Sequence, residues 1–268
     1  MVVQNADYAI ELSQLTKMYG DFAAVNHIDL RVKKGEIFAF LGPNGAGKST
    51  TIKMLTTLLR PTSGSLKLMG REVTDDPTAA RKSFGVVFQD PSLDDGLTAY
   101  ENMEFHATLY GLPRKGLRER IMELLKLVEL DDREKALIKT FSGGMRRRLE
   151  IARGLLHKPH VLFLDEPTLG LDTQTRNLLW NYVRQLRDEN GMTIFFTTHY
   201  IEEAEAVADR IAMIDHGEII ALGTADELKK QTKTDKLEKA YLALTGTTIR
   251  EEKVSNADRM RMRGRMGR

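Results

Sequence analysis

The sequence predicts an α/β fold with a mostly parallel sheet that is covered by helices on both faces. Short apolar runs with the character of buried strands recur at residues 35–42, 161–166 and 192–198. Segments with apolar residues at helical spacing lie between them. Because strands that alternate with helices are joined by crossovers, they pair in parallel and bury both faces of the sheet.

The expected elements follow in order along the chain. The first ninety residues are expected to contain strands at 9–12, 28–32, 35–42, 65–70 and 84–90, and a helix from Gly47 to Leu59. Pro61 and Gly64 end that helix. Three helical segments from Leu97 to His157 predict a helical insertion. Later elements are strands at 161–166 and 192–198, a helix at 175–190 between them, and a hairpin at 211–223.

These elements predict a main domain at residues 8–228, with the helical insertion at about 97–158. The remaining residues, 229–268, are expected to form a lysine-rich helical extension and then a basic tail. Five of the last ten residues are arginine, and no apolar pattern there can build a core. We expect a solvated, disordered tail, and contact with anionic lipid or nucleic acid is the alternative.

Composition limits the classes of protein that the chain can belong to. Its 268 residues are 41% hydrophobic, enough for a packed core, and 40 basic against 38 acidic residues leave a net charge of +2. The average charge therefore gives no reason to expect a nucleic-acid or membrane-surface partner. The absence of cysteine excludes disulfides and fits the cytoplasm. We find neither a signal-peptide pattern nor an apolar run of ~18 residues, so we expect no membrane span and no secretion.

The strongest local pattern is GPNGAGKS, which runs from Gly42 to Ser49 after an apolar strand and at the start of a helix. Its glycines let backbone amides turn toward one phosphate group, and the helix N-terminus adds partial positive charge there. Lys48 can reach the β- and γ-phosphates and Ser49 can ligate Mg²⁺. A glycine-rich turn is the alternative. The expected nucleotide-binding residues of this loop are Gly42, Pro43, Asn44, Gly45, Ala46, Gly47, Lys48, Ser49 and Thr50.

A second cluster is predicted where other strands end. Asp165 and Glu166 follow an apolar strand, and two adjacent carboxylates there are costly unless a cation lies between them. Asp165 is the expected Mg²⁺ ligand and Glu166 the general base, although a helix-capping acid is the alternative. His199 follows another strand and is expected beside them as a γ-phosphate sensor. Gln89 ends a strand and is a weaker candidate for the metal or the water.

The stretch from Phe141 to Asp172 resembles the ATP-binding cassette family. The family's signature is typically Leu-Ser-Gly-Gly-Gln, and here Phe141, Ser142, Gly143, Gly144 and Met145 stand in its place. Ser142 can cap the helix that begins near Gly144, which leaves open amides for an anion. A glycine hinge with an N-cap is the alternative. The Met145 side chain cannot repeat the polar role of an amide.

The resemblance covers about residues 10–227 and implies a fold and further roles. The implied fold is a P-loop NTPase with a RecA-like core, a small antiparallel β subdomain and an inserted helical subdomain. Two copies would pair head to tail, so that residues 142–145 of one contact the ATP held by the other. The resemblance also assigns Tyr19 to adenine stacking, Gln89 to the loop that links nucleotide and membrane partner, residues 169–172 with Asp172 to the dimer loop, and His199 to the switch histidine.

Within the family, the phrases MRRRLE, LYGLP and LEKAYLALTG resemble ATP-binding subunits of drug exporters of the daunorubicin-resistance kind. This implies an ATPase that acts with ATP and Mg²⁺ on the cytoplasmic face of the membrane, docked through residues 89–110 on separate membrane subunits. The alternative is a soluble cassette ATPase for nucleic acid or ribosomes. Such relatives carry a long coiled-coil insertion or a second cassette, and this sequence contains neither. A regulator without turnover is disfavoured by Glu166.

Overall fold

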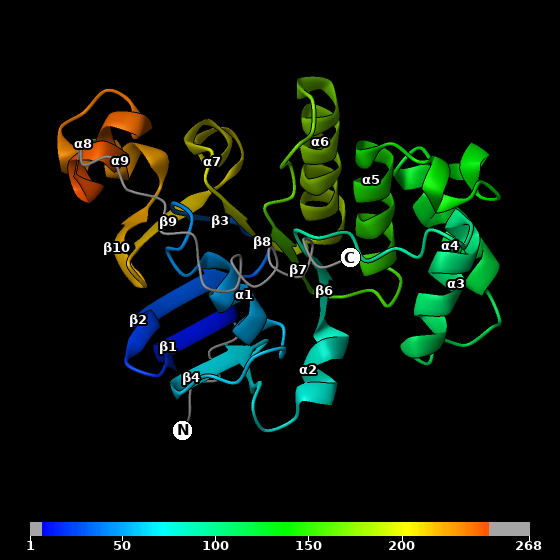
Figure 1. Cartoon of the computed structure of the whole chain (residues 1–268), viewed down its shortest axis with the longest axis horizontal. Coiled ribbons are helices and arrows are strands. Elements are labelled where there is room, and N and C mark those ends of the chain that lie inside the picture. The colour runs from blue at the N-terminus through cyan, green and yellow to red at the C-terminus, as the bar shows by residue number, and fades with distance from the viewer. Residues whose placement is uncertain (1–6, 247–268) are drawn as a thin grey trace, which may run out of the picture.

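The computed structural model describes residues 7–246, which form two sheets with helices around them (Figure 1). The antiparallel sheet has the order β2-β1-β4-β5, and the larger sheet has the order β10-β9-β3-β8-β7-β6. All neighbours in the larger sheet are parallel except β10 and β9. The strands are β1 (Tyr8–Tyr19), β2 (Phe22–Lys33), β3 (Ile37–Leu41), β4 (Ser63–Leu68), β5 (Arg71–Glu72), β6 (Phe84–Val87), β7 (Val161–Asp165), β8 (Thr193–Thr198), β9 (Arg210–Asp215) and β10 (Glu218–Gly223).

The side chains of β3 alternate between the two faces of the larger sheet, and each face packs against a different layer. Ile37, Ala39 and Leu41 pack into the core shared with the later helices, whereas Phe38 and Phe40 pack against the antiparallel sheet and the first helix. Because successive side chains of a strand point to opposite faces, a fully apolar strand is what a sheet between two layers requires. The predicted α/β class is therefore confirmed.

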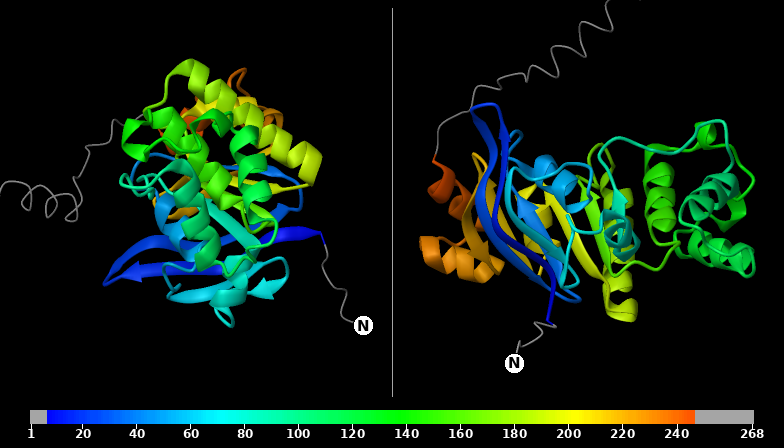
Figure 2. Two further views of the ribbon diagram at one scale, coloured as in Figure 1. Left: turned by 90° about the vertical axis from the view of Figure 1, so that its right-hand side faces the viewer. Right: turned by 90° about the horizontal axis from the view of Figure 1, so that it is seen from below.

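The helices gather around the sheet and at the two ends of the molecule. Figures 1 and 2 show α3, α4 and α5 together at one end and α8 and α9 at the other. The helices are α1 (Lys48–Leu55), α2 (Pro77–Ser83), α3 (Ala99–Leu109), α4 (Leu117–Leu127), α5 (Gly143–Gly154), α6 (Thr173–Asn190), α7 (Ile201–Val207), α8 (Ala225–Thr232) and α9 (Leu237–Thr245). Thr98 begins α3 with a capping box that includes Glu101.

Two predicted boundaries differ from those observed. The first helix ends at Leu55, four residues before the predicted Leu59, because Thr57 takes a left-handed φ of 64°. The division expected at residue 229 falls within α8, and Leu228, Leu237 and Ala240 of α8 and α9 are buried in the main core.

The arginine-rich segment at the C-terminus lies outside the residues that the structure describes. Among the helices of residues 7–246, none has both the length and the apolar character that crossing a bilayer demands.

Candidate active site at the carboxyl ends of the parallel strands

The loop between β3 and α1 turns sharply around its glycines. Gly45 and Gly47 have φ values of 79° and 107°, which residues with a Cβ rarely adopt. A Cβ on Gly42 would lie 2.4 Å from the Ile214 carbonyl oxygen, so the loop also packs too closely on β9 for a larger residue. The sequence motif therefore reflects backbone geometry. This geometry presents amides and the N-terminus of α1 to an anion.

Lys48 is held within this loop by its own backbone. Its Nζ donates to the carbonyl oxygens of Gly42 at 2.8 Å and Pro43 at 3.1 Å. The same ammonium lies 3.2 Å from Oε1 of Glu166, and both side chains are almost completely buried. Burial lowers the pKa of Lys48, an effect that the charges of Glu166 and Asp165 oppose. The cation that two adjacent carboxylates require is therefore Lys48.

The end of β7 brings the acid pair to the loop. The Ser49 hydroxyl donates to Oδ1 of Asp165 at 3.3 Å, and the Thr197 hydroxyl donates to the same oxygen at 2.6 Å. Thr197 also accepts a hydrogen bond from the Glu166 amide at 3.0 Å. Because β8 lies between β3 and β7, its Thr197 fixes the Asp165 carboxylate and the backbone of Glu166 beside the phosphate loop. Sequence reasoning did not identify Thr197, although it stands two residues before His199 at the same strand end.

His199 follows β8 and reaches Glu166. Its Nδ1 lies 3.0 Å from Oε2 of Glu166, and its ring packs on Tyr200 with centroids 4.1 Å apart. The two oxygens of Glu166 thus contact two different partners, Lys48 and His199. Glu166 has a φ of 45°, a left-handed backbone conformation that non-glycine residues seldom adopt. A carboxylate placed in this way can polarise a water, and the histidine beside it can donate to an oxyanion.

The remaining predicted site residues lie elsewhere on the surface of the chain. Tyr19 ends β1 and is 52% exposed, which contradicts the alternative that it is an ordinary buried tyrosine. Gln89 is exposed in the loop that follows β6. Within residues 7–246, no hydrogen bond or ion pair joins Tyr19, Gln89 or residues 142–145 to the cluster of Lys48, Asp165, Glu166 and His199.

The signature segment forms the N-terminus of α5. The Ser142 hydroxyl accepts from the Met145 amide at 3.2 Å, so Ser142 is the N-cap as predicted, and the helix begins at Gly143. A Cβ on Gly144 would lie 2.5 Å from Cγ2 of Thr175, so α5 packs closely on the start of α6. Asp172 is the exposed N-cap of α6. It accepts from the amide and hydroxyl of Thr175, which lower its pKa.

Sequence reasoning also missed a buried carboxylate on α7, that of Glu203. Glu203 of α7 accepts from the hydroxyls of Thr168 and Thr198, the latter at 2.7 Å, and from the Trp180 indole at 2.9 Å. It therefore ties the turn after Glu166 to the residue before His199. A sequence shows only an acidic residue on a short helix here, and this signal does not separate Glu203 from its exposed neighbour Glu202.

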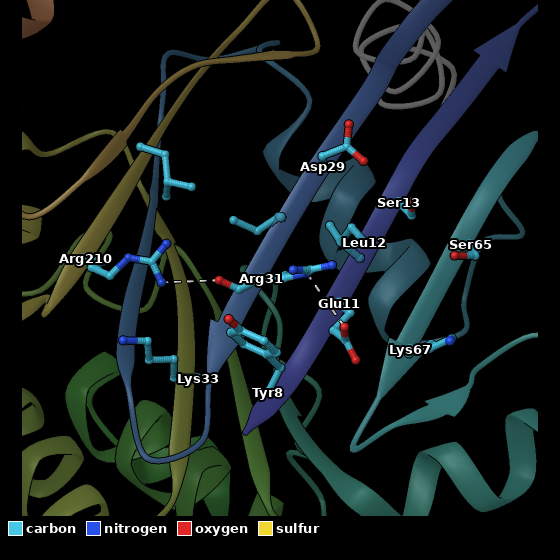
Figure 3. A pocket seen from close by; sticks show the side chains of 12 residues that line it. Tyr8, Glu11, Leu12, Ser13, Asp29, Arg31, Lys33, Ser65, Lys67 and Arg210 are labelled. Carbon is cyan, nitrogen blue, oxygen red and sulfur yellow. Dashed lines mark hydrogen bonds and ion pairs between the residues drawn. The ribbon is translucent and has the colours of Figure 1, made fainter. Parts of the chain in front are cut away.

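A cavity of about 630 Å³ lies away from this cluster, on the outer face of the antiparallel sheet. Tyr8, Glu11, Arg31, Lys67 and Arg210 are among the residues that line it (Figure 3). Arg31 lies 3.8 Å from Glu11, so charges within the cavity partly neutralise each other. Its lining contains no residue of the phosphate loop or the acid pair.

Comparison with known proteins decides which family this geometry belongs to. The sequence profile of the ABC transporter family matches residues 25–169, more than half of the chain. The chain belongs to the ABC transporter family. The daunorubicin/doxorubicin resistance ATP-binding protein DrrA of Streptomyces peucetius is 50% identical to this cassette, over 82% of the cassette and 67% of the relative. The linearmycin resistance ATP-binding protein LnrL of Bacillus subtilis is 44% identical, over 82% of the cassette and 70% of the relative.

Solved structures agree with this assignment. An ATP-binding subunit of an ABC transporter superimposes with a TM-score of 0.80 at 30% identity, covering 88% of this cassette and 99% of that chain. A dimeric ATP-binding cassette in a post-hydrolysis state, bound to ADP and Pi, superimposes with a TM-score of 0.73 at 30% identity, covering 80% and 98%. The cassette is therefore an ATPase that binds ATP, and the predicted recognition and fold are confirmed.

Proposed function

We propose that this cassette drives the export of small amphipathic drugs or natural products through separate membrane subunits. The observation that carries the proposal is the set of relatives: daunorubicin/doxorubicin and linearmycin resistance ATP-binding proteins both align over four fifths of the chain. The soluble alternative has less support, because the α-helices of residues 98–154 are the short α3, α4 and α5, and they form no long coiled coil. We place the cassette on the cytoplasmic face of the membrane that carries its partner.

The site geometry supports a division of chemical roles for hydrolysis. We assign the phosphates of ATP to the amides of residues 42–50 and to Lys48, and the activation of water to Glu166. In its doubly protonated form, His199 can donate through Nδ1 to Glu166 and through Nε2 to the γ-phosphate. Tyr19, exposed at the end of β1, offers its ring to adenine.

Oxygen ligands in this cluster fit Mg²⁺. Ser49 and Asp165 provide a hydroxyl and a carboxylate 3.3 Å apart, and Gln89 offers an amide oxygen from the next strand end. Within residues 7–246, no three carboxylate or imidazole side chains form a self-sufficient metal site. This matches an ion that takes its other ligands from phosphate and water. When bound, Mg²⁺ would neutralise charge on the β- and γ-phosphates.

A second copy of the chain would complete the nucleotide site. The N-terminus of α5 presents Ser142, Gly143, Gly144 and Met145 as an anion site, and the first turn of this helix has no acidic residue. Leu169 and Asp172 lie at the surface directly after Glu166. We propose that each copy contributes residues 142–145 and the 169–172 loop to ATP held by its partner.

The export proposal is tested in everted membrane vesicles that contain the cassette and the membrane protein encoded beside its gene. ATP-dependent uptake of a fluorescent anthracycline is expected, at least about threefold above vesicles that carry the inactive Glu166→Gln cassette. Equal uptake by the two preparations would contradict the export proposal while leaving the ATPase assignment intact.

The proposed docking surface makes a separate prediction. Phe105 and Leu109 occupy i and i+4 on α3 and are 61% and 68% exposed, an apolar pair next to the ring cluster of Tyr110 and His157. Replacing both Phe105 and Leu109 with serine should lower recovery of the cassette with partner-containing membranes about tenfold, because apolar burial drives association. ATPase activity of the isolated chain should stay within about twofold of wild type.

The matched control is Leu242→Ser on α9, which is 43% exposed at the opposite end of the molecule. It should leave membrane recovery unchanged. If the double variant sediments with membranes as well as wild type does, α3 is not the docking surface.

A further inference from the structure

Three charged side chains of α5 form a ridge on the face that packs against the core. Arg147, Glu150 and Arg153 recur at intervals of three, which places them on one side of a helix. Arg147 is only 7% exposed and Glu150 only 2%, and their charged groups lie 3.2 Å apart. Burying charges costs free energy unless they are fully paired, so the groups that pair with these three side chains indicate what the side chains hold in place. We call these three residues the α5 clamp.

One set of partners is the loop that contains Gln89. Arg147 donates to the carbonyl oxygen of Phe88, immediately before Gln89. Beyond Gln89, the Ser92 amide donates to Oε1 of Glu150 at 2.7 Å, and Arg153 donates to the Ser92 carbonyl oxygen at 2.7 Å. The clamp therefore holds the backbone on both sides of Gln89, although Gln89 itself is exposed.

The other set of partners is the backbone at the general base. Nη2 of Arg147 donates to the carbonyl oxygen of Glu166 at 3.2 Å, and its Nε donates to that of Pro167 at 2.9 Å. Thr197 holds the Glu166 amide from the opposite side. Because Glu166 has a positive φ, its conformation persists only where neighbouring groups fix it. The planar fork of an arginine can bridge several carbonyl oxygens at fixed angles.

We propose that the α5 clamp couples the Gln89 loop to the placement of Glu166, with Arg147 as the positioning residue. The inference rests on the proposed function, which assigns Glu166 as the base and Gln89 to the loop beside the membrane partner. Arg147 gives the Gln89 loop a side-chain connection to the backbone of Glu166, in addition to the direct pairing of β6 with β7. Because α5 begins at the signature, the same helix moves residues 142–145 with them.

The test compares steady-state ATPase kinetics of the full chain with those of Arg147→Met, which keeps the bulk of the side chain and removes its donors. We expect kcat to fall tenfold or more while the KM for ATP stays within threefold, since Arg147 is not among the residues assigned to the nucleotide. Arg147→Lys should also lose most of its turnover, because one ammonium cannot reach the carbonyl oxygens of Phe88, Glu166 and Pro167 together.

The matched control is Arg148→Met, the next arginine of the same helix. Arg148 donates to the Val128 carbonyl oxygen at 2.9 Å, lies 3.6 Å from Glu129 and also interacts with Tyr182 of α6. None of these partners belongs to the Gln89 loop or to the backbone at Glu166. The kcat of Arg148→Met should remain within twofold of wild type. If kcat falls equally in Arg147→Met and Arg148→Met, the loss reflects general packing of α5 and the proposal is overturned. A wild-type kcat in Arg147→Met would also overturn it.

Amide hydrogen exchange of residues 86–93 provides a measurement that needs no turnover. Glu150→Gln keeps the shape of the side chain and removes the counter-charge, so it is informative even if Arg147→Met does not fold. We expect exchange in this segment to quicken at least fivefold in Glu150→Gln and to remain unchanged in Arg148→Met. Unchanged exchange in Glu150→Gln would overturn the clamp. If the wild-type chain does not hydrolyse ATP, the proposed function is contradicted. The hydrogen-exchange comparison of Glu150→Gln with Arg148→Met would still test the clamp.

Discussion

Glu166→Gln should lower steady-state ATP hydrolysis by about 100-fold or more while leaving ATP binding near wild type. A positioned general base contributes about 10²–10⁴-fold to a rate, and an amide cannot accept the proton of the attacking water. The substituted amide can still accept from Lys48, which lies 3.2 Å from Oε1 of Glu166. The variant should therefore keep the geometry of the site and bind ATP, but it should not activate the attacking water.

The same variant tests the proposed pairing of two copies. If hydrolysis normally separates the copies, Glu166→Gln with ATP and Mg²⁺ should elute at twice the monomer mass in light scattering, whereas wild type should not accumulate there. Glu202→Gln is the matched control, because Glu202 is an exposed carboxylate on α7 near His199. Wild-type turnover in Glu166→Gln would rule out its role as the base.

Lys48→Ala should weaken ATP binding by about 10- to 150-fold. A charge-assisted hydrogen bond contributes about 1.5–3 kcal/mol, and the ammonium of Lys48 lies where the phosphates are expected. Its two carbonyl contacts within the loop, at 2.8 and 3.1 Å, show that the loop is built around this side chain. Titration with a fluorescent ATP analogue measures the change directly.

Lys48→Ala also carries a stability effect that must be separated from binding. Removing one member of a buried ion pair costs about 3–5 kcal/mol, because the other charge is left without its partner, and here that charge is Glu166. Thermal unfolding without nucleotide measures this cost. Lys53→Ala, an exposed lysine of the same helix, should change neither quantity. Binding as tight as that of the Lys53→Ala chain would disprove the phosphate contact.

Residues whose position depends on the local backbone could be predicted from the sequence. Gly42 to Ser49, Asp165, Glu166 and His199 all stand where an apolar strand ends, and parallel strands end at the same edge of a sheet. That rule was enough to expect them together. The length of the first helix was wrong, because the left-handed turn at Thr57 has no glycine to mark it.

The arginine run in MRRRLE shows what a sequence leaves open. Arg146 pairs with Asp95, Arg147 enters the core toward Glu166, and Arg148 lies between Val128 and Tyr182. Successive residues of a helix point about 100° apart, so the three cannot share one environment. Periodicity alone does not say which of them is buried, since all three have the same charge and the same helix propensity.

The fold class, the phosphate loop and the acid pair of this cassette were predictable, because each depends on residues close together in the chain. Three connections appear only in the folded chain: Lys48 pairs with Glu166, Thr197 bonds both Asp165 and Glu166, and Arg147 joins the Gln89 loop to the base. These contacts connect residues from 19 to 118 positions apart, as the numbering shows. These contacts form because buried polar groups must be hydrogen-bonded to other protein groups once water is excluded from the core.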